Sequence, residues 1–224
     1  MQVKDLSYTF PHQATAFFDR LNFELKSPGV NFLVGHNGAG KTTLADILTG
    51  LRPASGTDDL PKDAIYLNQR LPMLSSIRVS DVAQLILGIE MGRLRLDHDQ
   101  LMGRLDARTA AFLTPIWQTR YGQLSGGQRK LVQLLLFLQI DRSLVVLDEP
   151  TAAVDRENVT MMFDVMRAHP QRTYLVITHD VRDVTAFEDY QLLWLDQHRI
   201  ESFDRTAFET ATTLPPFLTA FKVQ

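Results

Sequence analysis

The stretch that decides the fold is Gly35-His36-Asn37-Gly38-Ala39-Gly40-Lys41-Thr42, which matches the phosphate-binding pattern G-x-x-x-x-G-K-[ST] in full. A short, mostly apolar run at residues 30–34 precedes it and indicates a buried strand, and a helical run at residues 42–48 follows it. Because the pattern requires a strand before it and a helix after it, the sequence predicts a P-loop nucleotide-binding fold. A glycine-rich turn without a ligand is the disfavoured alternative.

The residue types of this stretch suit a polyphosphate and its metal. Glycines at positions 38 and 40 allow a tight loop whose backbone N–H groups converge on phosphate oxygens. Lys41 neutralises charge on the β and γ phosphates, and the Thr42 hydroxyl is a possible magnesium ligand.

A second glycine-rich stretch, Leu124-Ser125-Gly126-Gly127-Gln128, precedes a helical run at residues 129–139. Two adjacent glycines let the backbone approach an anion, and a helix N-terminus carries partial positive charge. The same letters also suit an ordinary helix with Ser125 as its N-cap. On this stretch alone, both interpretations remain open.

Charged side chains follow two further buried strands. Residues 144–147 are apolar and lead to Asp148 and Glu149, and residues 173–177 lead to His179. Because ligands bind outside the carboxyl ends of strands in open α/β sheets, these groups are well placed for magnesium and water. A simple Asp-Glu-Pro turn at a strand end is the alternative for the first of them.

The composition bounds the class of protein. The 224 residues suffice for one buried core, or for a core with a small subdomain. A formal net charge of −3 gives no long-range attraction to nucleic acid, and the absence of cysteine excludes disulfides and thiolate metal sites. No apolar run is long enough to span a membrane, so we expect a soluble chain that would need another chain to work across one.

The other elements alternate between strand and helix, which favours an α/β fold with a mainly parallel sheet. Strands are expected at the N-terminus and at residues 23–25 and 64–67, and residues 80–113 have a mixed helical pattern. Residues 191–195 and 199–203 suggest a hairpin. The apolar tail at residues 214–221 suits either packing on its own core, which is favoured, or docking to a partner.

Five motifs occur in a fixed order: the P-loop, Gln69 ending a strand, Leu-Ser-Gly-Gly-Gln, Asp-Glu-Pro after an apolar strand, and Thr-His-Asp after another. This order resembles the nucleotide-binding subunit of ATP-binding cassette (ABC) transporters, from residue 3 to about residue 203. The resemblance implies one domain over residues 1–224 with a P-loop NTPase fold of the ABC ATPase type. Its mainly parallel core would span about 1–69 and 124–224, with a small N-terminal antiparallel β part and a helical subdomain inserted at about 70–123.

The resemblance also implies which residues contact ATP. Phe10 takes the place of the aromatic residue that stacks on adenine, although Tyr8 is a near neighbour. Leu124 to Gln128 would be the family signature stretch and would contact ATP held by a second cassette, and Asp155 would lie at the seam between the two. The implied ATP-contacting residues are Phe10, Gly35, Asn37, Gly38, Ala39, Gly40, Lys41, Thr42, Thr43, Ser125, Gly126, Gly127, Gln128 and Asp155.

Catalysis and magnesium binding are implied in the same way. Glu149 would be the general base for the attacking water, and His179 would contact the γ-phosphate. The implied catalytic residues are Glu149, His179, Lys41 and Gln69, and the implied magnesium-holding residues are Thr42, Gln69 and Asp148.

By this resemblance the chain hydrolyses ATP with Mg²⁺ and drives a separate multi-span membrane subunit from the cytoplasmic face of the membrane. A second cassette, identical or a paralogue, would complete the site. The alternative is a soluble ABC-type ATPase of an assembly system, such as iron–sulfur cluster assembly. The segment between Gln69 and Leu124 is too short for the long coiled-coil arm of repair and chromosome ATPases.

Overall fold

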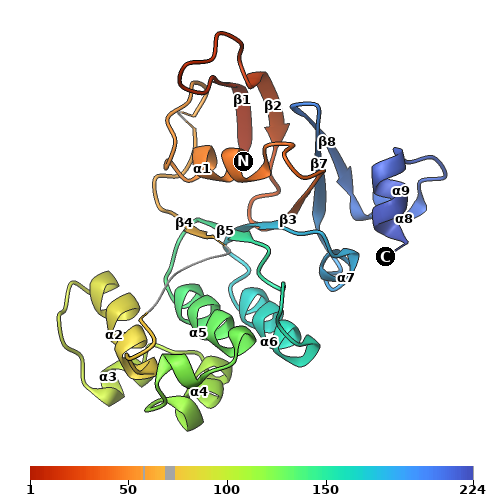
Figure 1. Cartoon of the computed structure of the whole chain (residues 1–224). Coiled ribbons are helices and arrows are strands. Elements are labelled where there is room, and N and C mark those ends of the chain that lie inside the picture. Colours follow the sequence, from red (N-terminus) through yellow and green to blue (C-terminus); the bar gives the residue numbers. More distant parts are fainter. Residues whose placement is uncertain (58, 69–73, 224) are drawn as a thin grey trace. The chain divides into compact units, whose positions relative to one another are not determined.

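The computed structural model describes residues 1–57, 59–68 and 74–223 (Figure 1). The chain forms two compact units. The first consists of Met1–Gln69, Arg142–Pro150 and Pro170–Gln224, and the second consists of Arg70–Asp141 and Thr151–His169.

The first unit contains a six-stranded sheet among its described residues, with the order β4-β5-β6-β3-β7-β8. Every neighbouring pair is parallel except β7 and β8, so the expected mainly parallel sheet is confirmed. The central strands β5 and β6 are buried on both faces, which is why their sequences are continuous apolar runs. The strands are β3 (Gly29–Val34), β4 (Ala64–Leu67), β5 (Leu144–Asp148), β6 (Thr173–Ile177), β7 (Gln191–Asp196) and β8 (Arg199–Asp204).

The N-terminal strands β1 (Gln2–Tyr8) and β2 (Phe18–Glu24) form a separate antiparallel pair, as expected. The prediction of β2 at residues 23–25 was wrong at its start, because the strand begins at Phe18. Arg20 has a positive φ of 48°, and the β1–β2 register shifts twice, so the simple alternation of apolar residues is broken.

Helix α1 (Lys41–Leu48) fixes the phosphate-binding loop to the core of the first unit. Its apolar residues, such as Leu44 and Ile47, are buried in one cluster with residues of β1, β2, β5 and β6. The loop of residues 35–40 is therefore held between β3 and a helix that the core immobilises.

The C-terminal part of the first unit comprises the β7–β8 hairpin and the helices α7 (Val181–Val184), α8 (Arg205–Thr210) and α9 (Pro216–Lys222). The hairpin turns at Gln197 and His198, which both have positive φ, as a two-residue type I′ turn requires. Leu218 and Phe221 of α9 are buried. The tail therefore packs on its own unit, which is the favoured expectation.

The second unit is helical in its described residues. Helix α5, which follows the second glycine-rich stretch, packs against α2, α4 and α6. Residues 124–141 and 151–169 group with the inserted helices rather than with the sheet. No helix in the described ranges is both long enough and apolar enough to cross a membrane. The helices are α2 (Val79–Glu90), α3 (His98–Met102), α4 (Ala107–Leu113), α5 (Gly126–Leu138) and α6 (Arg156–Arg167), with 3-10 turns at η1 (Thr114–Ile116) and η2 (Tyr121–Gln123).

Candidate functional site

A pocket of about 310 Å³ lies at the carboxyl end of the parallel strands in the first unit. It unites four segments of the chain: the connection between β1 and β2, the loop and first turn of α1, the end of β5 and the residues that follow β6. The lining residues are Phe10, Phe17, Asn37, Gly38, Gly40, Lys41, Thr42, Thr43, Asp148, Glu149 and His179.

The backbone at the start of α1 is open to the close approach of a ligand. Gly40 is the N-cap residue, and its φ of 106° lies in the left-handed region. A Cβ atom at this position would come within 2.6 Å of the Phe17 ring. No side chain caps the helix, so its first N–H groups face the loop without a competing side-chain acceptor.

Lys41 is held inside the loop that it follows. Its Nζ donates hydrogen bonds to the carbonyl oxygens of Gly35 at 2.6 Å and His36 at 3.0 Å. The side chain is buried, and this burial lowers the pKa of Lys41, while the carboxylates of Asp148 and Glu149 act in the opposite direction. The ammonium group is therefore bound by the loop, and both carboxylates stabilise its charge.

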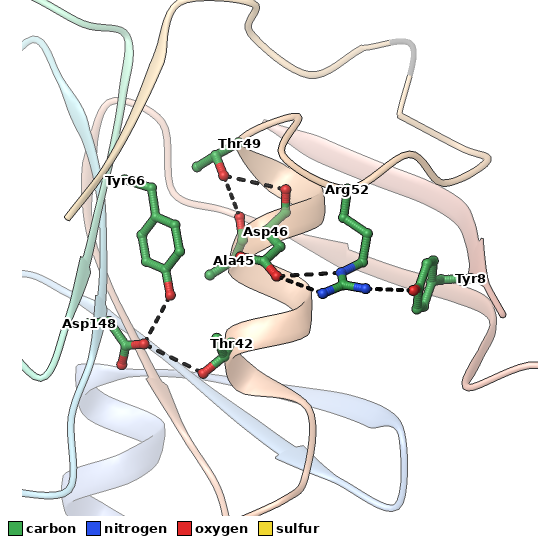
Figure 2. A network of polar contacts seen from close by, with 8 residues as sticks. All are labelled: Tyr8, Thr42, Ala45, Asp46, Thr49, Arg52, Tyr66 and Asp148. Atoms are coloured by element: carbon green, nitrogen blue, oxygen red, sulfur yellow. Dashed lines mark hydrogen bonds and ion pairs between the residues drawn. The ribbon is translucent and has the colours of Figure 1, made fainter. Parts of the chain in front are cut away.

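Two hydroxyl groups donate to one oxygen of Asp148 (Figure 2). The Tyr66 phenol lies 2.9 Å from Asp148 Oδ2, and the Thr42 hydroxyl lies 3.4 Å from the same atom. Burial raises the pKa of Asp148, and the hydrogen bond from Tyr66 opposes that effect. Burial likewise raises the pKa of Tyr66 far above its ordinary value, so the phenol stays protonated and donates.

The oxygen atoms of Thr42 and Asp148 fit magnesium. Mg²⁺ prefers hydroxyl and carboxylate oxygens, and it usually takes one or two carboxylates together with substrate phosphates and water. In the described part of the chain there is no cluster of three or more His, Cys, Asp or Glu side chains that would form a cage of its own. A single carboxylate and a hydroxyl beside a phosphate-binding loop match the magnesium pattern.

Glu149 and His179 face each other across the pocket. His179 Nε2 lies 3.3 Å from Glu149 Oε1. Burial lowers the pKa of His179, Lys41 adds to that effect, and both carboxylates oppose it, so the imidazole is neutral near pH 7. Glu149 has a φ of +47°, and its backbone N–H donates to the Ile177 carbonyl at 2.9 Å. This backbone hydrogen bond supports Glu149 in a sparsely populated backbone conformation.

Two aromatic rings also line the pocket. Phe10 and Phe17 make an edge-to-face pair with centroids 5.0 Å apart. Tyr8, the alternative to Phe10, is buried, and its hydroxyl accepts a hydrogen bond from Arg52 at 2.7 Å (Figure 2). The structure therefore brings Phe10, and not Tyr8, to the pocket.

Phe17 is a pocket residue that the sequence interpretation missed. It stands next to Phe18, whose side chain is fully buried in the core. Phe17 itself comes directly before β2, and its ring lines the pocket. The available signal was the pair of adjacent phenylalanines close to Phe10 in the sequence.

Comparison with known families decides the class of this site. Residues 18–152 match the family described as "ABC transporter". The chain belongs to the ABC transporter family.

Two relatives and one solved structure show the extent of the likeness to other ABC proteins. The chain is 26% identical to the arabinose import ATP-binding protein AraG 2 of Burkholderia ambifaria over 92% of its own length, but it spans 43% of that relative. It is 30% identical to the energy-coupling factor transporter ATP-binding protein EcfA2 of Halalkalibacterium halodurans, over 85% of this chain and 74% of the relative. A dimeric bacterial ABC transporter cassette superposes with a TM-score of 0.71 at 17% identity, over 91% of this chain and 97% of that one. The expected ABC ATPase fold is confirmed.

The ABC signature stretch lies in the second unit and forms an ordinary helix start. Ser125 Oγ accepts from the Gln128 N–H at 3.1 Å, and Gln128 Oε1 accepts from the Ser125 N–H at 3.0 Å. This reciprocal pair is a capping box, and it confirms Ser125 as the N-cap residue of α5. The helix prediction at residues 129–139 began too late, because both glycines belong to the first turn of α5.

The two signature glycines have different surroundings. A Cβ at Gly127 would come within 2.7 Å of the Ala153 carbonyl oxygen, so this glycine is required by packing inside the second unit. A Cβ at Gly126 would meet none of the described atoms within 4 Å. Only Gly126 thus has the open backbone that an approaching anion needs.

The remaining predicted residues fall into three groups. Gly35 and Ala39 belong to the phosphate-binding loop without lining the pocket. Asp155 is the N-cap of α6, where its carboxylate accepts from the Asn158 N–H at 3.0 Å. Gln69, predicted for both catalysis and magnesium, lies outside the described residues.

Proposed function

We propose that this chain binds MgATP in the first-unit pocket and hydrolyses it, as the cassette subunit of an ABC transporter. One observation carries the proposal: the ends of two parallel strands and the phosphate-binding loop bring an ammonium group, a hydroxyl, two carboxylates and an imidazole into one pocket. These groups belong to Lys41, Thr42, Asp148, Glu149 and His179.

The triphosphate fits the loop before α1. Backbone N–H groups at the helix start and the positive end of the helix dipole favour phosphate oxygens. Lys41 exchanges its two loop carbonyls for oxygens of the β and γ phosphates. Phe10 and Phe17 supply an aromatic surface for the base, since ring stacking suits any planar purine.

Thr42 and Asp148, the latter through water, would hold magnesium, and the family resemblance adds Gln69 to them. When bound, the ion would supply positive charge beside the β and γ phosphates.

Hydrolysis requires a base beside the attacking water. Glu149 accepts the proton of the water as the new bond to the γ-phosphorus forms and the bond to the leaving ADP oxygen breaks. The neutral His179 imidazole, 3.3 Å from Glu149, contacts the γ-phosphate as a hydrogen-bond donor. Phosphate and ADP are the products.

A second cassette, identical or a paralogue, completes the site. The related bacterial cassette has been solved as a dimer, which supports this part of the proposal. Ser125 and Gly126 of one chain close over ATP held by Lys41 of the other. Asp155 lies at the seam.

The membrane partner is a separate multi-span subunit, which places this chain at the cytoplasmic face of the membrane. The names of the two relatives, an arabinose import protein and an energy-coupling factor protein, support a transport role. Leu74, Leu85 and Ile89 of the second unit are 72%, 47% and 72% exposed and offer apolar contacts to such a partner.

The decisive experiment is Glu149→Gln. Removal of a general base slows hydrolysis by about two to four orders of magnitude, while ATP affinity stays at the wild-type value. Phosphate release is followed with purified protein, and nucleotide binding is measured separately with a non-hydrolysable ATP analogue. Glu24→Gln, at an exposed position of β2, is the matched control. Wild-type turnover by Glu149→Gln contradicts the proposal.

Copurification tests the partner. Multi-span membrane proteins that copurify with the tagged chain support the transporter, whereas soluble assembly factors support the alternative ATPase.

A further inference from the structure

Thr42 and Tyr66 both donate to Asp148 in Figure 2, and the proposed mechanism uses Thr42 but not Tyr66. It lies on β4, which pairs in parallel with β5, and it stands opposite Val146, two residues before Asp148. This register carries the phenol along the sheet to the carboxylate, where it donates to Oδ2 at 2.9 Å.

Packing alone does not explain the hydroxyl group. The ring of Tyr66 is half-buried against the core cluster of the first unit, and a phenylalanine ring would fill the same space. Only the hydroxyl group reaches Asp148. A buried polar atom is costly without a partner, and here the partner is the carboxylate placed to hold magnesium.

The geometry of the shared oxygen limits how Asp148 can move. Tyr66 approaches Oδ2 from β4, and Thr42 approaches the same atom from α1 (Figure 2). Two donors from different elements fix the rotation of the carboxylate. When magnesium engages the Thr42 oxygen, the phenol remains to orient Asp148.

We propose that Tyr66 is a positioning residue for magnesium, because its phenol orients the Asp148 carboxylate toward the ion. The inference rests on the proposed function, since it assumes that Asp148 holds magnesium beside bound ATP. Outer-sphere hydrogen bonds of this kind orient metal-binding carboxylates in many sites, and their loss costs about 10- to 100-fold in metal affinity.

Tyr66→Phe removes the hydroxyl and keeps the ring. The probe is Mn²⁺ as a paramagnetic substitute for Mg²⁺, titrated into protein that is in excess over the non-hydrolysable analogue AMP-PNP. Electron paramagnetic resonance then gives the Mn²⁺ concentration that half-fills the protein–nucleotide complex. We expect this concentration to rise about tenfold, the lower end of the range, because Asp148 acts through water. Affinity for AMP-PNP in EDTA is expected to stay at the wild-type value.

Two further variants separate positioning from general structure. Tyr190→Phe is the matched control, since Tyr190 is buried at the amino end of β7, and its Mn²⁺ titration should equal that of the wild type. In an Asp148→Asn background, Tyr66→Phe should have no additional effect on Mn²⁺ binding, because the phenol acts through that carboxylate.

Steady-state hydrolysis gives an independent measurement. Excess Mg²⁺ should restore turnover of Tyr66→Phe but not that of Glu149→Gln.

The outcomes are distinguishable. Equal Mn²⁺ titrations of wild type and Tyr66→Phe overturn the role of Tyr66 and leave the proposed function intact. A loss of AMP-PNP affinity in EDTA also overturns it, since the phenol would then shape the nucleotide pocket itself. If the wild-type protein binds no AMP-PNP, the proposed function is wrong, and the role of Tyr66 is wrong with it.

Discussion

Two helices of this chain begin at glycine-rich segments, and their first turns differ in how they satisfy backbone groups. Helix α1 starts at Gly40, in a left-handed conformation and without a side-chain cap. Helix α5 starts at Ser125, whose hydroxyl caps the first turn and whose own N–H is bound by Gln128.

The difference shows which helix start needs a ligand. The first N–H groups of an uncapped helix have no acceptor within the helix, and a phosphate supplies several acceptor oxygens at once. The capped start of α5 gains less from an anion within its own chain. We therefore expect nucleotide to stabilise the first unit strongly and to affect the second unit only when two cassettes close.

Among variants at the two helix starts, the largest expected effect comes from Ser125→Asp. Aspartate is as good an N-cap as serine, so the fold is retained, but its charge repels the γ-phosphate of ATP on the opposite chain. Hydrolysis should fall by about 100- to 1,000-fold, the range for loss of one essential anion contact, while AMP-PNP binding is unchanged. Phosphate release and isothermal titration measure the two quantities.

Ser125→Thr controls for the loss of the serine itself, because threonine keeps both the cap and the hydroxyl. Unchanged turnover of Ser125→Asp would mean that the signature stretch contacts no phosphate and serves α5 alone.

The next effect concerns the start of α1. Gly40→Ala places a Cβ against Phe17 in a backbone conformation that alanine avoids, and the expected loss is about 1–3 kcal/mol in the free energy of unfolding. AMP-PNP binding should weaken with it, since the loop has to shift. Urea unfolding and titration with AMP-PNP give both numbers.

Gly38→Ala is the matched variant, because Gly38 also has a positive φ but its Cβ would meet none of the described atoms within 4 Å. It should be the less damaging of the two. An equal loss of stability in both would show that backbone strain, and not contact with Phe17, governs the loop.

The smallest effect distinguishes the two signature glycines. Gly127→Ala forces a Cβ against the Ala153 carbonyl and should cost about 1–3 kcal/mol, the usual range for overpacking. Gly126→Ala has room and should stabilise the free chain by about 0.4–1 kcal/mol through the unfolded state. Urea unfolding of both variants checks the contrast.

The rate of ATP hydrolysis gives a second test of the contrast between Gly126 and Gly127. Gly126→Ala, although stable, should hydrolyse ATP more slowly, because its methyl group blocks the close approach of an anion. Wild-type turnover in this variant would remove the reason for an open backbone at Gly126.

Local sequence patterns predicted the part of the site that is continuous in the chain. Residues 30–34, the glycine-rich loop and residues 42–48 were placed within one residue of β3 and α1, because an apolar run, glycines and helical periodicity change at sharp borders. The carboxylates after β5 and the histidine after β6 were likewise found from strand ends. Asp148, Glu149 and His179 line the same pocket as Lys41 and Thr42.

Contacts between distant segments were not predictable in this way. Tyr66 and Asp148 are 82 positions apart, and only the register of β4 on β5 brings them together. The start of β2 was missed because positive φ at Arg20 interrupts its alternation. The grouping of residues 124–141 and 151–169 with the inserted helices depends on packing among helices, which a linear pattern does not contain.

The left-handed backbone at Glu149 has a consequence for how this protein would respond to selection for stability. A side chain other than glycine or asparagine in that conformation costs about 1–3 kcal/mol, so glycine at position 149 would relax the turn after β5. Enrichment of heat-resistant variants from a random library would therefore favour loss of the carboxylate that we propose as the general base. Under that proposal, only selection for turnover would retain glutamate at this position.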